Sequence, residues 1–162
     1  KDLRRKRIMI VGPRNCGKTS LANRLNRYTG PLRKTQDTIY GKYTIDVPSA
    51  FLENTDMYKH LIALSQDAWC ALIMVNQERI EHVYSHAFAN ALLCPSFGVI
   101  GKSDLAPENE AVCVKQLQTA GAREPYFRVN LLSENGTDEL EGFLREFYNE
   151  RNRGLDEIHN RK

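Results

Sequence analysis

The residues best suited to chemistry lie in one short stretch near the N-terminus. Residues 12–19 read GPRNCGKT, which matches the G-x-x-x-x-G-K-[ST] pattern of phosphate-binding loops. In such loops, backbone N–H groups and the positive end of the following helix point at phosphate oxygens. An apolar run, residues 8–11, precedes the stretch and a helical pattern follows it, as this loop requires. We therefore predict that nucleotide phosphates bind here.

The residues that we expect to contact the nucleotide from this loop are Gly12, Asn15, Cys16, Gly17, Lys18, Thr19 and Ser20. Lys18 is expected to reach the β- and γ-phosphates with its charge. The Thr19 hydroxyl is expected to bind Mg²⁺, which prefers oxygen ligands. Asn15 can adopt the left-handed backbone conformation that glycine usually provides. Lys18 and Arg14 are the catalytic candidates, although the bulk of Arg14 is also expected to crowd the γ-phosphate.

Further ligands for Mg²⁺ are expected outside the loop. Asp46 follows a β-prone run, and an acidic residue at such a point can hold Mg²⁺ through water. Thr35 is the expected second hydroxyl ligand, with Thr38 as its competitor and an ordinary loop role as the alternative. The predicted metal residues are therefore Thr19, Thr35 and Asp46, and the predicted cofactor is Mg²⁺ with GTP or ATP.

A base-binding pattern follows another apolar run. Residues 101–104 read GKSD, where guanine-binding proteins carry Asn-Lys-x-Asp or Thr-Lys-x-Asp. The stem of Lys102 is expected to lie over the base, and Asp104 is expected to accept hydrogen bonds from guanine. A hydrogen bond to a charged group contributes about 1.5–3 kcal/mol. Gly101 lacks the side chain that links this segment to the phosphate loop, so we expect weak guanine selectivity.

These residues must be positioned by alternating strands and helices. Periodicity predicts strands at 8–11, 69–75, 97–100 and 126–129, and a hairpin formed by 38–40 and 43–46. Helices are predicted over about 18–27, 51–66, 78–93 and 107–121, with a last helix from near 137. Such alternation implies right-handed crossovers between parallel strands. We predict a three-layer α/β fold of the P-loop NTPase class, with a mostly parallel sheet and helices on both faces.

The composition is that of an ordinary globular protein. The 162 residues are predicted to form one domain, 1–150, followed by a charged tail, 151–162. The net charge is +3, and the basic residues clustered in 1–7 have no interleaved aromatics, so no nucleic-acid partner is expected. No apolar segment approaches the roughly 20 residues of a membrane span, so no membrane partner is expected. The four cysteines lack C-x-x-C spacing, which is typical of reduced thiols in a cytoplasmic protein.

With these features in view, the chain resembles the EutP/PduV family, small phosphate-loop proteins of ethanolamine and propanediol utilisation that are related to Ras-like GTPases. The resemblance covers about residues 6–148. It rests on residues 12–20, Lys34-Thr35-Gln36, Ile45-Asp46 with Pro48, Leu52-Glu53-Asn54, Lys102 with Asp104-Leu105, Ala120-Gly121-Ala122, and Gly136 with Asp138-Glu139-Leu140. It implies a Ras-like fold, a cytoplasmic location at a bacterial microcompartment and a shell protein as a partner. An ATP-dependent acetate kinase activity is associated with the EutP side of the family.

The chain departs from the family pattern after Asp46. The family's Asp-Thr-Pro-Gly-Glu-Tyr becomes DVPSAF at residues 46–51. Ser49 is less free than glycine to turn its N–H toward a γ-phosphate, and Ala50 cannot orient an attacking water. We therefore expect weak or slow hydrolysis.

Three functions remain open on these residues. The first is a nucleotide-binding protein with slow hydrolysis. The second is a small-molecule kinase acting on acetate, with Arg14 or Arg33 binding the anion. The third is an adaptor that keeps the phosphate loop for structure and docks a shell protein through its charged N-terminus or through helices 78–93 and 137–150.

Three weaker patterns each have two interpretations. His82 and His86, with Glu78, form either a metal pair or a solvated helix face. Cys16 is either a thiol activated by the helix N-terminus and Lys18 or a small residue that fills the loop. Trp69 is either part of the core or a platform for stacking a base.

Overall fold

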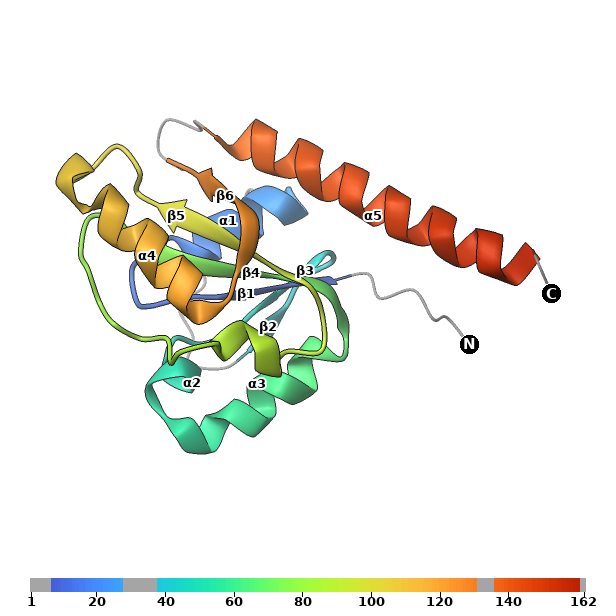
Figure 1. Cartoon of the computed structure of the whole chain (residues 1–162), viewed down its shortest axis with the longest axis horizontal. Coiled ribbons are helices and arrows are strands. Elements are labelled where there is room, and N and C mark those ends of the chain that lie inside the picture. The colour runs from blue at the N-terminus through green and yellow to red at the C-terminus, as the bar shows by residue number, and fades with distance from the viewer. Residues whose placement is uncertain (1–6, 28–37, 131–135, 161–162) are drawn as a thin grey trace.

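A twisted, mostly parallel sheet forms the middle layer of the computed structural model, which describes residues 7–27, 38–130 and 136–160, with side chains up to residue 154. Within these residues the sheet has six strands in the order β2-β3-β1-β4-β5-β6 (Figure 1). They are β1 (Arg7–Val11), β2 (Ile39–Tyr40), β3 (Thr44–Asp46), β4 (Ala68–Asn76), β5 (Ser96–Gly101) and β6 (Arg123–Arg128). Only the pairing of β2 with β3 is antiparallel among these neighbours, which confirms the predicted hairpin.

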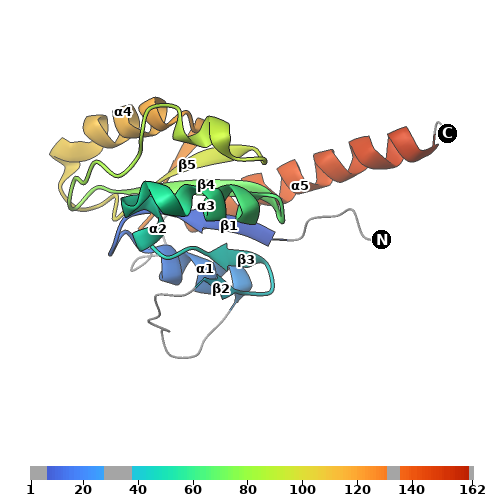
Figure 2. The same ribbon diagram turned by 90° about the horizontal axis from the view of Figure 1, so that it is seen from below.

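Helices cover both faces of this sheet, so the predicted three-layer α/β fold is confirmed (Figures 1 and 2). The helices are α1 (Lys18–Asn26), α2 (Ala50–Glu53), α3 (Tyr58–Ser65), α4 (Glu110–Ala120) and α5 (Thr137–Asn160). Short 3-10 turns cover Thr55–Met57, Phe88–Ala91 and Pro107–Asn109. Alternate side chains of each strand point to opposite faces. Ile10 and Leu72 therefore pack with α1 and α5, while Met9 and Ile73 pack with α3 and α4.

The predicted helix over 78–93 is wrong. Residues 78–87 are not helical, and only a 3-10 turn follows at Phe88–Ala91. The apolar residues spaced along this segment do face the core, but its backbone bonds go to α4 instead of to its own carbonyls. Gln116 donates to the Glu81 carbonyl at 3.0 Å, and the Ala87 N–H donates to the Thr119 carbonyl at 2.7 Å. The spacing of the apolar residues therefore indicated correctly which side chains face the core, but it did not indicate the backbone conformation of the segment.

The predicted helix over 51–66 is interrupted. Asn54 has an extended backbone, and its side chain accepts a hydrogen bond from the Asp56 N–H at 2.9 Å, which caps a new turn. The chain therefore forms the short α2 and then α3. This break places α2 close to the phosphate loop and leaves α3 on the sheet face.

The last helix is longer than the sequence indicated. Residues 151–162 were predicted to be a charged tail after this helix, but α5 continues to Asn160 and projects clear of the sheet in both views (Figures 1 and 2). Arg24 of α1 forms ion pairs with Asp138 at 3.1 Å and Glu141 at 2.9 Å, which tie the start of α5 to the body. Trp69 packs edge-on against Tyr148, so its assignment to the core is confirmed.

Candidate functional site

The phosphate loop connects the end of β1 to the start of α1. Two residues of the loop have left-handed backbones, Asn15 with φ 61° and Gly17 with φ 100°. The predicted conformation of Asn15 is therefore confirmed. A Cβ at Gly12 would lie 2.6 Å from the Cys16 sulfur, so the loop closes on itself and only glycine fits at residue 12. The fold thus places the phosphate loop at the N-terminus of α1, where an anion is favoured, although Pro13 supplies no N–H.

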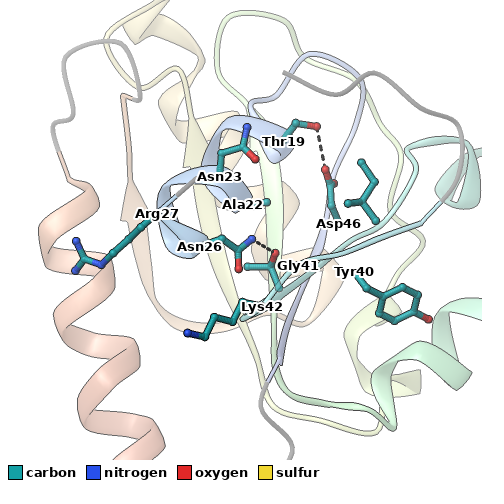
Figure 3. A pocket seen from close by; sticks show the side chains of 11 residues that line it. Thr19, Ala22, Asn23, Asn26, Arg27, Tyr40, Gly41, Lys42 and Asp46 are labelled. Atoms are coloured by element: carbon teal, nitrogen blue, oxygen red, sulfur yellow. Dashed lines mark hydrogen bonds between the residues drawn. The ribbon is translucent and has the colours of Figure 1, made fainter. Parts of the chain in front are cut away.

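Thr19 and Asp46, two of the predicted Mg²⁺ ligands, meet at one edge of this loop. The Thr19 hydroxyl donates to Asp46 Oδ2 at 2.9 Å, as Figure 3 shows. Asp46 ends β3 and is 7% exposed, and this burial raises the pKa of its carboxyl, while the Thr19 hydroxyl and the Lys18 charge lower that pKa. A hydroxyl and a carboxylate in contact are hard oxygen donors and fit Mg²⁺. Thr35 lies outside the described residues, and Thr38 lies half-buried before β2.

A cavity of about 350 Å³ extends from this contact between α1 and the β2–β3 hairpin. Figure 3 shows Thr19 and Asp46 at one end, with Asn26 and Lys42 farther along. Asn26 donates to the Thr44 hydroxyl at 2.7 Å and accepts from the Tyr43 N–H at 2.7 Å. The polar groups of Asn26 thus hold the hairpin against α1, and with it the end of β3 that carries Asp46.

The Cys16 thiol is not activated. Its side chain is 1% exposed, and burial raises its pKa to about 11, with the Lys18 charge opposing the shift only in part. The reactive-thiol interpretation is therefore wrong. The Cys16 side chain fills the space beside Gly12 below the loop.

Arg14 lies at the mouth of the loop and faces α2. Its Nε is 3.7 Å from Glu53 Oε1, and the two side chains are 68% and 49% exposed. Glu53 was part of the Leu-Glu-Asn resemblance, but it was not predicted as a site residue. The contact puts one positive and one negative group beside the phosphate loop, with Ala50 exposed at the start of the same short helix.

The base segment, residues 101–105, follows β5 beside the loop. A Cβ at Gly101 would lie 2.2 Å from the Cys16 carbonyl oxygen, so the two backbones touch directly. Lys102 has a left-handed backbone, φ 55°, and its Nζ is 3.0 Å from Glu78 Oε1. Asp104 is exposed. Lys102 is therefore held by a carboxylate that the sequence pattern did not identify.

Sequence reasoning also missed the polar end of β4. Asn76 and Gln77 are 5% and 2% exposed, and both make hydrogen bonds to neighbouring loops. The only available signal was two amides directly after an apolar strand. Tyr84 was likewise not predicted as a functional residue, yet its hydroxyl donates to the Met74 carbonyl at 2.6 Å, and burial raises its pKa well above the usual range.

Two other groups of residues do not form sites. His82 and His86 do not lie on a helix, so the spacing that suggested a metal pair does not apply. Among the described residues, no group of three or more His, Cys, Asp or Glu side chains is arranged to hold a metal ion.

No helix in the described ranges has the length and apolarity that a bilayer crossing needs.

Comparison with known proteins gives matches over most of the chain. A family model described as "Ethanolamine utilisation - propanediol utilisation" (PduV-EutP) matches residues 5–146. The propanediol utilization protein PduV of Citrobacter freundii is 34% identical over 140 residues, which are 86% of this chain and 93% of that protein. The probable acetate kinase EutP of Escherichia coli (strain K12) is 28% identical over 141 residues, covering 86% of this chain and 89% of that protein.

Solved structures share the fold at lower identity. Elongation factor SelB of Methanococcus maripaludis, solved with the GTP analogue GppNHp, has a TM-score of 0.64 and 19% identity. The match covers 92% of this chain but only 35% of SelB, so this chain spans about a third of that protein. A probable GTP-binding protein engB has a TM-score of 0.62 and 16% identity, with 89% of this chain and 99% of engB covered. Identities this low show the fold alone.

Proposed function

Because the chain belongs to the PduV-EutP family of ethanolamine and propanediol utilisation proteins, we propose that it binds a Mg²⁺–nucleoside triphosphate at its phosphate loop and hydrolyses it slowly. The observation that carries this proposal is the contact between the Thr19 hydroxyl and Asp46 Oδ2 at 2.9 Å beside the loop. It brings two oxygen donors together, one from the first turn of α1 and one from the end of β3, and these side chains would hold Mg²⁺ beside the phosphate loop.

The proposed roles follow from where each group lies. The loop amides and Lys18 would bind the phosphates, and Thr19 and Asp46 would hold Mg²⁺, which would supply positive charge beside the phosphates. Lys102 and Asp104 lie on the base segment. The residue types support GTP or ATP alike, because Gly101 departs from the guanine pattern.

Slow hydrolysis is supported by the segment after Asp46. Ser49 has an ordinary right-handed backbone, φ −59°, which any residue adopts, so slow hydrolysis is expected from Ala50 and not from the lack of glycine at residue 49. Ala50 is exposed at the start of α2, and its methyl group cannot orient a water for attack. The nearest acidic group on that helix, Glu53, faces Arg14.

Calorimetric titration with GTP, GDP and ATP in Mg²⁺ tests the proposal. Lys18→Ala is expected to weaken triphosphate binding roughly a hundredfold, since truncating one partner of a close charge pair costs about 2–5 kcal/mol. Lys115→Ala is the matched control, because it removes the same charge from an exposed position on α4. If the folded, unmodified protein binds none of the three nucleotides, the proposal fails.

A second candidate is phosphoryl transfer to acetate. The exposed Arg14 guanidinium beside the loop supports it, as does the similarity to proteins described as probable acetate kinases. Acetyl phosphate production from ATP and acetate, lost in Arg14→Ala, is the expected result. Arg79→Ala is the control, because Arg79 is an exposed arginine whose ion pair with Glu81 lies outside the loop. Absence of product from the unmodified protein excludes this function.

A third candidate is an adaptor docked on a microcompartment shell protein in the cytoplasm. The projecting end of α5 supports it, because this end lies clear of the sheet and is free to meet a partner (Figure 1). Lys18→Ala should then leave partner binding and location unchanged. Loss of location in Lys18→Ala would favour a nucleotide-dependent role.

A further inference from the structure

Gly101 cannot brace the base segment to the phosphate loop, because it has no side chain. It also cannot acquire one in this arrangement, since a Cβ would lie 2.2 Å from the Cys16 carbonyl oxygen. A main-chain atom cannot move aside as a flexible side chain can. The bracing group must therefore come from another residue at the same level of the sheet.

Asn76 occupies that level. Asn76 pairs with Gly101 in the register of β4 and β5. It therefore lies on the neighbouring strand, directly beside the residue that lacks a side chain. Its Nδ2 donates to the Asn15 carbonyl of the phosphate loop at 3.4 Å, and its Oδ1 accepts from the Glu78 N–H at 2.9 Å. Asn76 thus connects the loop to the end of β4.

Gln77 connects the end of β4 to the base segment. Its Nε2 donates to the Ser103 carbonyl at 2.8 Å and to the Leu105 carbonyl at 3.0 Å, and its N–H donates to the Gly101 carbonyl at 3.0 Å. The Asn109 side chain donates to the Gln77 carbonyl at 3.0 Å. Residues 101–105 therefore wrap around one buried side chain.

The orientation of the Gln77 amide follows from these partners. A flipped amide would point its oxygen at two carbonyl oxygens, so both N–H groups must face the base segment. The cost is visible at Oε1, which is buried and has no hydrogen-bond partner among the described residues. A buried polar atom without a partner is rare and needs a reason. Holding Ser103 and Leu105 supplies that reason.

We infer that Asn76 and Gln77 are positioning residues for the nucleotide base, supplying from β4 the link between phosphate loop and base segment that Gly101 lacks. This inference rests on the proposed nucleotide binding. Neither residue touches the base: they fix the segment that carries Lys102 and Asp104 relative to the phosphates.

The test compares a nucleotide with a ligand that has no base. Gln77→Leu keeps the size of the side chain and removes both donors. With Mg²⁺, it is expected to weaken binding of the preferred nucleotide, GTP or ATP, about tenfold, as the loss of two hydrogen bonds implies. Affinity for inorganic tripolyphosphate should stay within about twofold, because the loop contacts remain. A purely structural role would move both affinities together.

Two further variants keep the result interpretable. Ser65→Ala removes buried hydrogen bonds far from the loop, to the Ile62 carbonyl and from the Leu93 N–H, and should change neither affinity. Asn109→Ala removes only the hydrogen bond to the Gln77 carbonyl, so nucleotide affinity should fall by less, about threefold. This variant tests the inference if Gln77→Leu does not fold.

Amide hydrogen exchange reports on the segment itself. Exchange at Ser103 and Leu105 should rise in Gln77→Leu, even without ligand, because their N–H groups bond to Val129 and Lys102 only while the segment is held. Equal losses for nucleotide and tripolyphosphate, or no loss for either, overturn the inference. If the folded, unmodified protein binds tripolyphosphate but no nucleotide, or binds neither, the proposed function fails first.

Discussion

At the scale of single residues, the burial of Asp46, the proposed Mg²⁺ ligand, carries a cost in stability. Burial raises the pKa of its carboxyl, so the folded protein holds that proton more tightly than the unfolded chain does. The stability that this group contributes is therefore present at low pH and is lost as the pH rises through the folded pKa. The Thr19 hydroxyl lowers the same pKa, so its hydrogen bond offsets part of the free-energy cost of burying the ionised carboxylate.

The first prediction concerns Asp46→Asn. The amide still accepts from Thr19 but carries no charge, so the variant should gain roughly 1 kcal/mol at neutral pH, or about 2–4 °C in Tm. The gain should shrink as the pH falls through the raised pKa of Asp46, because the native carboxyl then becomes protonated and loses its charge. Mg²⁺-dependent nucleotide binding should be lost. Thermal unfolding at several pH values checks the first part and calorimetry the second; a variant less stable at pH 7 contradicts the argument.

Glu78 restrains Lys102 through an ion pair of 3.0 Å. Exposed pairs of this kind contribute about 0–1 kcal/mol. The second prediction is that Glu78→Gln frees the lysine and tightens nucleotide binding by up to about fivefold, since 1 kcal/mol is that factor. Tripolyphosphate binding should not change.

Glu81→Gln is the control for this prediction, because it breaks an exposed pair with Arg79 in the same segment. Unchanged or weaker nucleotide binding in Glu78→Gln would show that the carboxylate helps Lys102 instead of withholding it.

At the scale of elements, the end of β5 lies directly against the phosphate loop. This contact leaves no room for a side chain at residue 101. The third prediction is that Gly101→Asn, which restores the guanine pattern, destabilises the protein and does not improve GTP binding. The new Cβ would overlap the Cys16 carbonyl. Forcing atoms into a packed site costs about 1–3 kcal/mol. Gly142→Asn is the matched control, with no atom within 4 Å of its Cβ.

Chemical denaturation of both variants, with GTP titration, makes the comparison. If Gly101→Asn is as stable as Gly142→Asn and binds GTP more tightly, then the loop can withdraw from β5 and the asparagine serves the guanine directly.

The elements show where sequence reasoning succeeds. The phosphate loop and α1 were predictable because the motif, the strand before it and the helix after it are all local in the chain. Residues 78–87 were not, because the apolar spacing of a helix and of a segment bonded to α4 is the same. Gln77 was invisible for a related reason: its partners Ser103 and Leu105 lie 26 and 28 residues away.

At the scale of the whole molecule, α5 raises the question of where the domain ends. Arg151 Nη1 donates to the Trp69 carbonyl at 3.3 Å, and Phe147 and Tyr148 pack on the Trp69 ring. The helix then leaves the sheet (Figure 2). The division of the chain near residue 150 stays a prediction, and α5 runs through that boundary without a break.

The fourth prediction tests that division by truncation. A chain ending at Asn152 keeps the Arg151 contact and should melt within about 2 °C of the full chain. A chain ending at Glu146 loses Phe147 and Tyr148, two half-buried aromatics that pack on Trp69, and should lose roughly 3 kcal/mol, the lower end of the range for truncating one buried aromatic. Differential scanning calorimetry distinguishes them. Marked destabilisation of the chain that ends at Asn152 would show that the end of α5 belongs to the folded unit.

The two outer strands of the sheet are both poor templates for pairing. β2 is two residues long, and the Arg7 guanidinium lies over its Tyr40 ring, 5.6 Å from the centroid. β6 reads REPYFR, with a proline that lacks an N–H and with Arg123, Glu124 and Arg128 exposed. Short, charged or proline-bearing margins resist edge-to-edge aggregation. The sheet margins should therefore not drive fibril growth, even at high protein concentration.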